Sequence, residues 1–304
     1  MAMATTAQNQ PQSKGQMNAQ KLATTLYLIE NFYVDTANID KVTEDAIIAA
    51  LKELDPHSAY ISKKDVEKAN EPLVGSFEGI GVTYQLIRDT ITVISPVAGG
   101  PSEKVGIMAG DQFIKIDGED AFGKKIDNEY VQKRLRGKKG TKVTVSVKRG
   151  NDTELLDFEI IRDKIPLNSI NAAYMLDNHV GYIKLDRFAQ ESTQEFKEAF
   201  AKLQAQGMES LIFDLRGNTG GYLNTAIELV DQFLPEDQLV VFTEGIHSPR
   251  QEWRSTASGL YTTGKLVVLI DEGSASASEI LSGAMQDHDR GIVIGRRSFG
   301  KGLV

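Results

Sequence analysis

From Ile165 onward the chain alternates between short apolar runs and amphipathic stretches, and no other feature of the sequence restricts the fold as strongly. The apolar runs are Val180–Leu185, Leu211–Leu215, Leu239–Phe242, Leu266–Ile270 and Ile292–Ile294. Between them, apolar residues recur at helical spacing in 192–206, 223–233 and 280–285. Buried strands that alternate with helices are typical of layered α/β folds. We therefore expect residues 164–304 to form an α/β core, with the polar stretch Gly245–Gly264 as a surface loop.

The preceding stretch, residues 75–163, has a different pattern. Five short runs rich in β-branched and aromatic residues are separated by turn signals such as Asp117-Gly118. These runs are Gly81–Leu86, Ile91–Ile94, Gln112–Ile116, Val143–Lys148 and Leu156–Ile161, with helix candidates at Gly100–Val105 and Ile126–Arg134. The pattern predicts a compact α+β domain of about 90 residues, so the chain is multidomain.

The N-terminal part of the chain predicts helices. In residues 17–74, apolar side chains repeat at helical spacing in two segments, and a short third segment begins near Ser62. Residues 1–16 are polar and predict a disordered lead-in. The helical region could be a packing platform or the arm of a homodimer, and the sequence does not decide between these roles.

Composition excludes several classes of function. The net charge of −8 argues against nucleic acid or an anionic membrane surface as the main partner. The chain has no cysteine, so disulfides and cysteine-ligated metals are excluded. Its four histidines are far apart and show no metal-ligand spacing. No apolar run approaches the roughly 18 residues of a membrane span.

A serine and a lysine near the end of the sequence suggest catalytic chemistry. Ser276 lies in the segment Gly273–Ile280, which predicts a strand, a sharp turn and a helix. Lys301 lies between glycines after the last predicted strand. A serine hydroxyl needs a base to become a nucleophile, and a lysine acts as that base only when burial lowers its pKa. We expect Ile294 and Phe299 to supply the apolar surroundings.

A glycine-rich turn follows another predicted strand. The sequence there is Asp214-Leu215-Arg216-Gly217-Asn218-Thr219-Gly220-Gly221. Glycines allow close approach of the backbone, and their N–H groups can point toward a developing oxyanion. Such a turn is weak evidence by itself and gains weight from Ser276 and Lys301 downstream.

The domain at 75–163 resembles a PDZ domain. The resemblance rests on Gly79-Ile80-Gly81-Val82, which matches the loop that receives a peptide's terminal carboxylate, and on the block Gly106-Ile107-Met108-Ala109-Gly110-Asp111. Free N–H groups in such a loop form an anion nest, and the adjacent strand edge can pair with an extended peptide. The resemblance implies substrate binding at Gly79, Ile80, Gly81 and Val82. The alternative is that the domain is only a spacer.

The whole chain from about residue 17 resembles the carboxyl-terminal processing, or tail-specific, proteases of the S41 serine peptidase family. The resemblance rests on Leu54-Asp55-Pro56-His57-Ser58, the PDZ domain, the glycine-rich block, Gly273–Ile280 and Phe299-Gly300-Lys301-Gly302. It implies a Clp-protease/crotonase-like core. It also implies Ser276 as nucleophile and Lys301 as general base. The oxyanion hole would consist of the N–H groups of Gly220 and Ala277, with Gly221 as the near alternative. Ser274 and Ser278 are competitors for the nucleophile.

Two positions depart from the family pattern. The family usually has proline where Thr219 stands, which predicts a less rigid loop. The glutamine that orients the family's lysine would be at position 305, after Val304. We therefore expect the chain to be a fragment or a truncated form, with an incomplete core and little or no peptidase activity.

The resemblance also implies how such a protease would work. It would need no metal or organic cofactor, and its substrates would be proteins or peptides with apolar C-terminal residues. It implies a periplasmic or cell-envelope location. A homodimer formed through the N-terminal helices stays one of the two roles open for that region. Two alternatives stay open: a non-catalytic peptide- or ligand-binding protein on the same fold, and a crotonase-like hydratase.

Overall fold

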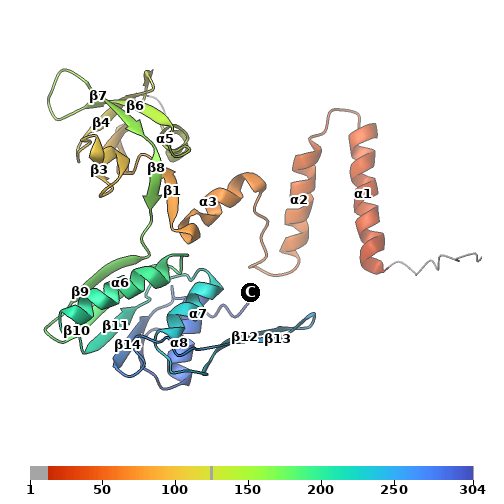
Figure 1. Ribbon diagram of the computed structural model, residues 1–304. Helices are drawn as coiled ribbons and strands as arrows, with labels where there is room; N and C mark the ends of the chain where they lie inside the picture. Colours follow the sequence, from red (N-terminus) through yellow and green to blue (C-terminus); the bar gives the residue numbers. More distant parts are fainter. Residues whose placement is uncertain (1–12, 124–125, 304) are drawn as a thin grey trace, which may run out of the picture. The chain divides into compact units, whose positions relative to one another are not determined.

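The computed structural model describes residues 13–123 and 126–303 (Figure 1). The chain divides into two compact units, Met1–Ala69 and Asn70–Val304. Most of the predicted disordered lead-in, residues 1–12, lies outside the described residues. Residues 13–16 are instead part of an ordered helix start, because Ser13 Oγ accepts a hydrogen bond from Gln16 N at 3.2 Å and Gln16 Oε1 accepts from Ser13 N at 2.9 Å.

The predicted N-terminal helices are confirmed as α1 (Lys14–Phe32), α2 (Ile39–Lys52) and α3 (Lys63–Val74). Asn38 caps α2 by accepting the N–H of Lys41 at 3.0 Å. No residue of α1 or α2 is buried, although α1 carries large apolar side chains such as Tyr27 and Phe32. Helix α1 therefore exposes large apolar side chains.

The β-rich domain contains all five predicted strands and both predicted helices. Its strands are β2 (Val82–Ile87), β3 (Thr90–Pro96), β4 (Gln112–Ile116), β5 (Glu119–Asp120), β6 (Lys142–Lys148) and β7 (Leu156–Ile161), and its helices are α4 (Pro101–Lys104) and α5 (Asn128–Leu135). The sheet order is β2-β3-β4-β6-β7, with β5 paired to β4. Side chains such as Ile91, Phe113 and Val145 are fully buried in its core. Strand β2 is an edge strand.

Two short strands flank this domain. Strand β1 (Ser76–Gly79) pairs antiparallel with β8 (Asp163–Pro166), so the points where the chain enters and leaves the domain are joined. The sequence analysis did not predict either strand. Both are only four residues long, and a run of this length carries little periodicity.

The C-terminal core is built on a five-stranded sheet of order β15-β14-β11-β10-β9. Its strands are β9 (Ile170–Met175), β10 (Val180–Leu185), β11 (Ser210–Asp214), β14 (Lys265–Ile270) and β15 (Ile292–Gly295). Strand β9 is antiparallel to β10, and the other neighbouring pairs are parallel. Helices α6 (Ser192–Ala205), α7 (Leu223–Asp231) and α8 (Ala277–Asp287) contribute to its core, where Phe196, Phe213 and Phe233 pack together.

The predicted loop at Gly245–Gly264 is wrong for its first part. Strand β13 (Ser248–Arg254) pairs antiparallel with β12 (Leu239–Gly245) in a separate two-stranded sheet. All residues of β13 except Trp253 are exposed. Because the strand has no buried face, its sequence does not alternate between apolar and polar residues. Arg250 lies over the ring of Phe242, 3.8 Å from its centroid, in place of an apolar contact.

Within the described residues, none of the helices combines the length and the apolar character needed to cross a bilayer.

Candidate active site

Three parallel strands deliver the predicted catalytic segments to one edge of the core sheet. The glycine-rich turn follows β11, the Ser276 segment follows β14, and the Lys301 segment follows β15. Because these strands are parallel neighbours, their carboxyl ends lie at the same edge. The sheet order therefore explains how residues about 60 positions apart, such as Asn218 and Ser278, come into contact.

Ser276 lies immediately before α8 in a strained backbone conformation. Its φ of 56° and ψ of −111° are unfavourable for a residue with a Cβ atom. Ser276 is partly exposed, whereas Ser274 and Ser278 are fully buried. The hydroxyl of Ser274 donates to Leu215 O at 2.8 Å and that of Ser278 to Asn218 O at 2.8 Å. These two serines therefore tie the turn to the glycine-rich loop, and Ser276 is the accessible hydroxyl of the three.

The glycine-rich loop lies against the Ser276 turn. Asn218 O accepts the N–H of Ala275 at 3.0 Å as well as the Ser278 hydroxyl. A Cβ atom on Gly220 would lie 2.9 Å from Ser276 Cβ and 3.0 Å from Ala277 N, so the close approach requires glycine. The predicted oxyanion residues Gly220 and Ala277 are thus adjacent.

The N–H groups of these residues differ in their hydrogen bonds. Gly220 N donates to Asn218 Oδ1 at 2.9 Å. Among the described residues, no acceptor is found for the N–H of Gly221 or of Ala277.

Lys301 is joined to Ser276 through the carboxylate of Glu279. Glu279 Oε2 accepts Ser276 N at 2.7 Å and Lys301 N at 2.9 Å, so these two backbone nitrogens lie within two hydrogen-bond lengths of each other. Glu279 Oε1 accepts Ser298 Oγ at 2.8 Å and Gly300 N at 2.6 Å. No hydrogen bond connects Lys301 Nζ with Ser276 Oγ in the described part of the chain.

Glu279 is a residue to which the sequence analysis gave no role. Burial would raise the pKa of its carboxyl, but the hydrogen bonds from Ser298 and from the N–H groups of Ser276, Gly300 and Lys301 hold that pKa below the ordinary value. The Ser276-x-x-Glu279 spacing, which matches a capping box, was the signal that could have identified it.

The two residues expected to form apolar walls around Lys301 are both exposed. Ile294, on the edge strand β15, is 51% exposed, and Phe299 is 62% exposed. The lysine side chain itself is half-buried.

Asp214 anchors the start of the glycine-rich loop. Its buried carboxylate accepts Tyr182 Oη at 2.6 Å and Arg216 Nη2 at 2.6 Å. Burial opposes the charge of Asp214, but Arg216 and Tyr182 hold its pKa below the usual range. Burial and the neighbouring Asp214 carboxylate raise the pKa of Tyr182 to about 12. The Asp214 carboxylate therefore stays charged at neutral pH, and the Arg216 guanidinium neutralises it.

A second candidate site is a groove between β2 and α5. It has a volume of about 120 Å³ and is lined by Phe77, Ile80, Gly81, Val82, Tyr84, Val131, Gln132, Leu135 and Arg136. Of the four predicted carboxylate-binding residues, Ile80, Gly81 and Val82 line it, and Gly79 does not. In the described chain, no acceptor is found for the N–H group of Gly81. The groove therefore combines apolar walls, a free donor and an open strand edge.

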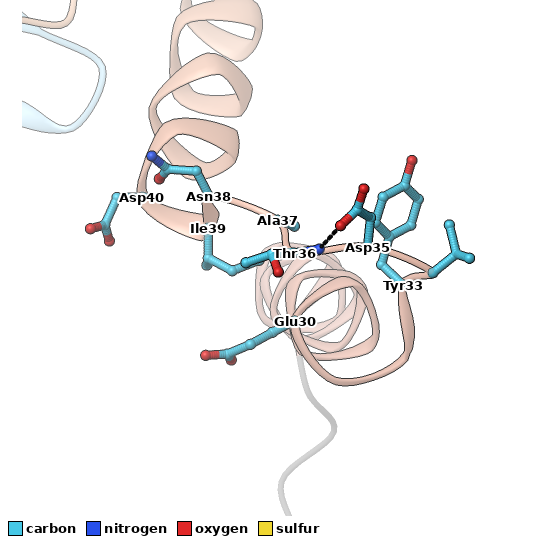
Figure 2. A pocket seen from close by; sticks show the side chains of 9 residues that line it. Glu30, Tyr33, Asp35, Thr36, Ala37, Asn38, Ile39 and Asp40 are labelled. Carbon is cyan, nitrogen blue, oxygen red and sulfur yellow. Dashed lines mark hydrogen bonds between the residues drawn. The ribbon is translucent and has the colours of Figure 1, made fainter.

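A further hollow, of about 790 Å³, lies at the connection of α1 and α2. Figure 2 shows its lining residues, in which the carboxylates of Glu30, Asp35 and Asp40 point in different directions. None of the predicted site residues lines it. Across residues 13–123 and 126–303, no three histidine or acidic side chains are grouped to hold a metal ion.

Comparison with known proteins finds a matching family for the C-terminal core and for the β-rich domain. Residues 179–304 match peptidase family S41, and residues 79–160 match the PDZ domain. The chain is 37% identical over 278 residues to a protein of Staphylococcus haemolyticus named a probable CtpA-like serine protease. That alignment covers 91% of the chain but 55% of the relative, so the chain spans a little over half the length of the curated relative.

Two solved structures are also similar. The photosystem II D1 C-terminal processing protease is 25% identical, with a TM-score of 0.49 over 93% of this chain and 82% of that one. The PDZ domain of a carboxy-terminal protease from Vibrio cholerae, solved in complex with a peptide, is 35% identical, with a TM-score of 0.28 over 30% of this chain and 99% of that one.

Proposed function

Residues 179–304 belong to peptidase family S41 and residues 79–160 form a PDZ domain, and on this premise we propose that the protein is a serine endopeptidase that cleaves proteins at or near their C-termini. Ser276 is the nucleophile and Lys301 the general base. The observation that carries this assignment is the Glu279 carboxylate, which binds the backbone N–H groups of both residues.

The reaction proceeds through an acyl-enzyme. Neutral Lys301 Nζ takes the proton of Ser276 Oγ as the oxygen attacks the scissile carbonyl carbon. The resulting oxyanion is stabilised by the Ala277 N–H and by an N–H of the Gly220-Gly221 pair. The protonated lysine then donates its proton to the departing amine. Water, activated by Lys301, hydrolyses the ester and restores Ser276.

The choice of Ser276 over its neighbours has a physical basis. The hydroxyls of Ser274 and Ser278 are buried and donate to backbone carbonyls, so neither is free to attack a substrate. The positive φ of Ser276 holds its side chain at the turn between strand and helix, as in the nucleophile turns of other serine hydrolases.

Cleavage of an unfolded protein substrate, measured in a chain extended to the length of the curated relatives, tests this function. Ser276→Ala should abolish cleavage while leaving the fold intact. Ser274→Ala is the matched control, and it should retain substantial activity because its hydroxyl has only a structural contact. Near-normal turnover by the Ser276→Ala protein would reject the assignment. Peptide binding without cleavage by the unaltered protein would favour the non-catalytic alternative.

We further propose that the PDZ groove holds the substrate's C-terminal residues. Its free Gly81 N–H group suits a carboxylate, and its apolar walls suit an apolar last side chain. A peptide that ends in a free acid should therefore bind more tightly than the same peptide with an amidated C-terminus. Equal affinities of the two forms would favour the alternative that the domain is only a spacer.

For the N-terminal helices we propose a second copy of the chain as the partner. Tyr27 is 58% exposed and Phe32 is 72% exposed on α1, and such exposed apolar surface on unburied helices favours association. Phe32→Glu should shift the protein from dimer to monomer in sedimentation experiments, whereas Glu30→Gln should not. A monomer before any substitution would overturn this proposal.

A further inference from the structure

Asn218 connects three parts of the active-site edge. It is fully buried. Its Nδ2 donates to Leu185 O at 2.9 Å, and its Oδ1 accepts the N–H of Gly220 at 2.9 Å. Its backbone carbonyl accepts Ala275 N and Ser278 Oγ. One residue therefore joins the end of β10, the glycine-rich loop and the Ser276 turn.

The orientation of the Asn218 carboxamide is fixed by its partners. A 180° flip would place the amide NH₂ against the Gly220 N–H and the amide oxygen against the Leu185 carbonyl. Both contacts would then be between groups of the same kind, two donors or two acceptors. The buried carboxamide thus has one stable orientation, and in that orientation its oxygen holds the N–H of Gly220.

The next peptide unit of the loop points the other way. The carbonyl of Gly220 accepts the N–H of Phe188 at 2.9 Å. In a trans peptide the C=O and the following N–H point in opposite directions, so the Gly221 N–H points away from Phe188. No acceptor for it is found among the described residues.

We propose that Asn218 is a positioning residue that selects the oxyanion donor: by holding the Gly220 N–H, it leaves the Gly221 N–H to act with that of Ala277. The proposal deepens the proposed peptidase function and depends on it. Asn218 does not touch the substrate. It acts by fixing the loop conformation in which one glycine N–H is satisfied and the next is free.

Selective isotope labelling can separate the two glycine signals. Thr-Gly pairs occur at 219–220 and 263–264, and Gly-Gly pairs occur at 99–100 and 220–221. Carbonyl-¹³C threonine with ¹⁵N-glycine therefore selects Gly220 and Gly264, and carbonyl-¹³C glycine with ¹⁵N-glycine selects Gly100 and Gly221. In the free protein the Gly220 amide should be protected from hydrogen exchange, and the Gly221 amide should exchange fast. The opposite order would overturn the proposal.

A peptide boronic acid then tests which N–H faces the reacting atoms. Ser276 Oγ forms a bond to boron, its proton passes to Lys301, and no group leaves. The Gly221 amide should then shift strongly and become protected, while the Gly220 amide changes little. A large change at Gly220 instead would refute the assignment. If the boronic acid does not attach to Ser276, the proposed function fails, and the exchange rates of the free protein still decide whether Asn218 holds Gly220.

Kinetics of Asn218 variants complete the test. Asn218→Ala should lower kcat by roughly 100-fold, the effect of losing one oxyanion donor, with KM nearly unchanged. Asn218→Asp keeps an acceptor for Gly220 N and, when its buried carboxyl is protonated, a donor for Leu185 O, so it should recover part of kcat. Ser278→Ala, which loses a bond to the Asn218 carbonyl but leaves the carboxamide intact, is the control and should keep most of kcat. Equal losses of kcat in Asn218→Ala and Asn218→Asp would contradict the proposal that the Asn218 carboxamide determines which glycine N–H is the oxyanion donor.

Discussion

Glu279→Gln is the substitution that most sharply tests how the active site is held together. The carboxylate receives four hydrogen bonds, two at each oxygen. Glutamine has nearly the same shape but only one accepting oxygen. If its NH₂ replaces Oε2, the N–H groups of Ser276 and Lys301 lose their acceptor. If it replaces Oε1, Ser298 Oγ and Gly300 N lose theirs.

The size of the effect follows from this count. A buried donor left without an acceptor costs about 1–3 kcal/mol. Glu279 is only partly buried, so water can satisfy some of the lost bonds, and two stranded donors should cost about 2 kcal/mol in unfolding free energy. The segment 298–301 would also be released from the Ser276 turn. We therefore expect peptide cleavage to fall by at least about 100-fold, because small displacements of a catalytic group have large effects on rate.

Glu272→Gln is the matched control. Glu272 belongs to the same active-site edge and forms an ion pair with Arg296, but both side chains are largely exposed. Exposed pairs contribute about 0–1 kcal/mol, so this variant should be close to the unaltered protein in stability and activity. The unaltered protein, Glu279→Gln and Glu272→Gln are compared in two measurements. These are the stability to thermal unfolding and the rate of cleavage of the same unfolded substrate.

The pH dependence gives a second readout. The folded-state pKa of Glu279 lies below its ordinary value of 4.5, so the charged form stabilises the folded protein. This contribution is fully present above the ordinary value and is lost as pH falls through the lowered pKa. The stability difference between the unaltered protein and Glu279→Gln should thus be constant above about pH 5.5 and shrink in more acidic solution. Equal differences at pH 4 and pH 7, or normal cleavage by Glu279→Gln, would refute the reasoning.

Two other substitutions test separate parts of the account. Lys301→Arg should be as inactive as Lys301→Ala, because a guanidinium cannot take the serine proton. Appreciable cleavage by the arginine variant in a steady-state assay would exclude Lys301 as the base. Gly81→Ala should weaken binding of a free-acid peptide at least about tenfold, because Gly81 has a φ of 73° and an added Cβ would lie 2.9 Å from Ile165 Cδ1. If calorimetry shows an unchanged affinity, this loop does not bind the carboxylate.

Sequence reasoning worked best where burial imposes a regular pattern. The bounds of Gln112–Ile116, Leu156–Ile161 and Val180–Leu185 were predicted to the residue. Apolar and polar residues alternate over part of each strand, and the pattern is regular even in Leu156–Ile161, where only Ile160 is buried. Strand β13 was missed because nearly all of its residues face solvent and leave no such pattern. Exposed hairpins of this kind are defined by pairing with a neighbour, which a single sequence does not display.

Motifs in the sequence predict the segments of the proposed active site but not the contacts between them. Motifs identified the segments of Ser276, Lys301 and Gly220. The role of Glu279 depends on β15 lying beside β14 in parallel, which brings residues 298–301 to the start of α8. The hydrogen bond that occupies the Gly220 N–H depends on the local backbone conformation, which the glycine-rich sequence permits but does not specify.

The central claim is that Ser276 attacks the substrate with Lys301 as its base. The most direct measurement is to mix the protein with a peptide thioester, quench with acid, and locate the acyl group by mass spectrometry of proteolytic fragments. The account predicts an acyl group on Ser276, absent when Lys301 is replaced by alanine. Acylation of Ser274 or Ser278, or acylation of Ser276 that persists without Lys301, would contradict it.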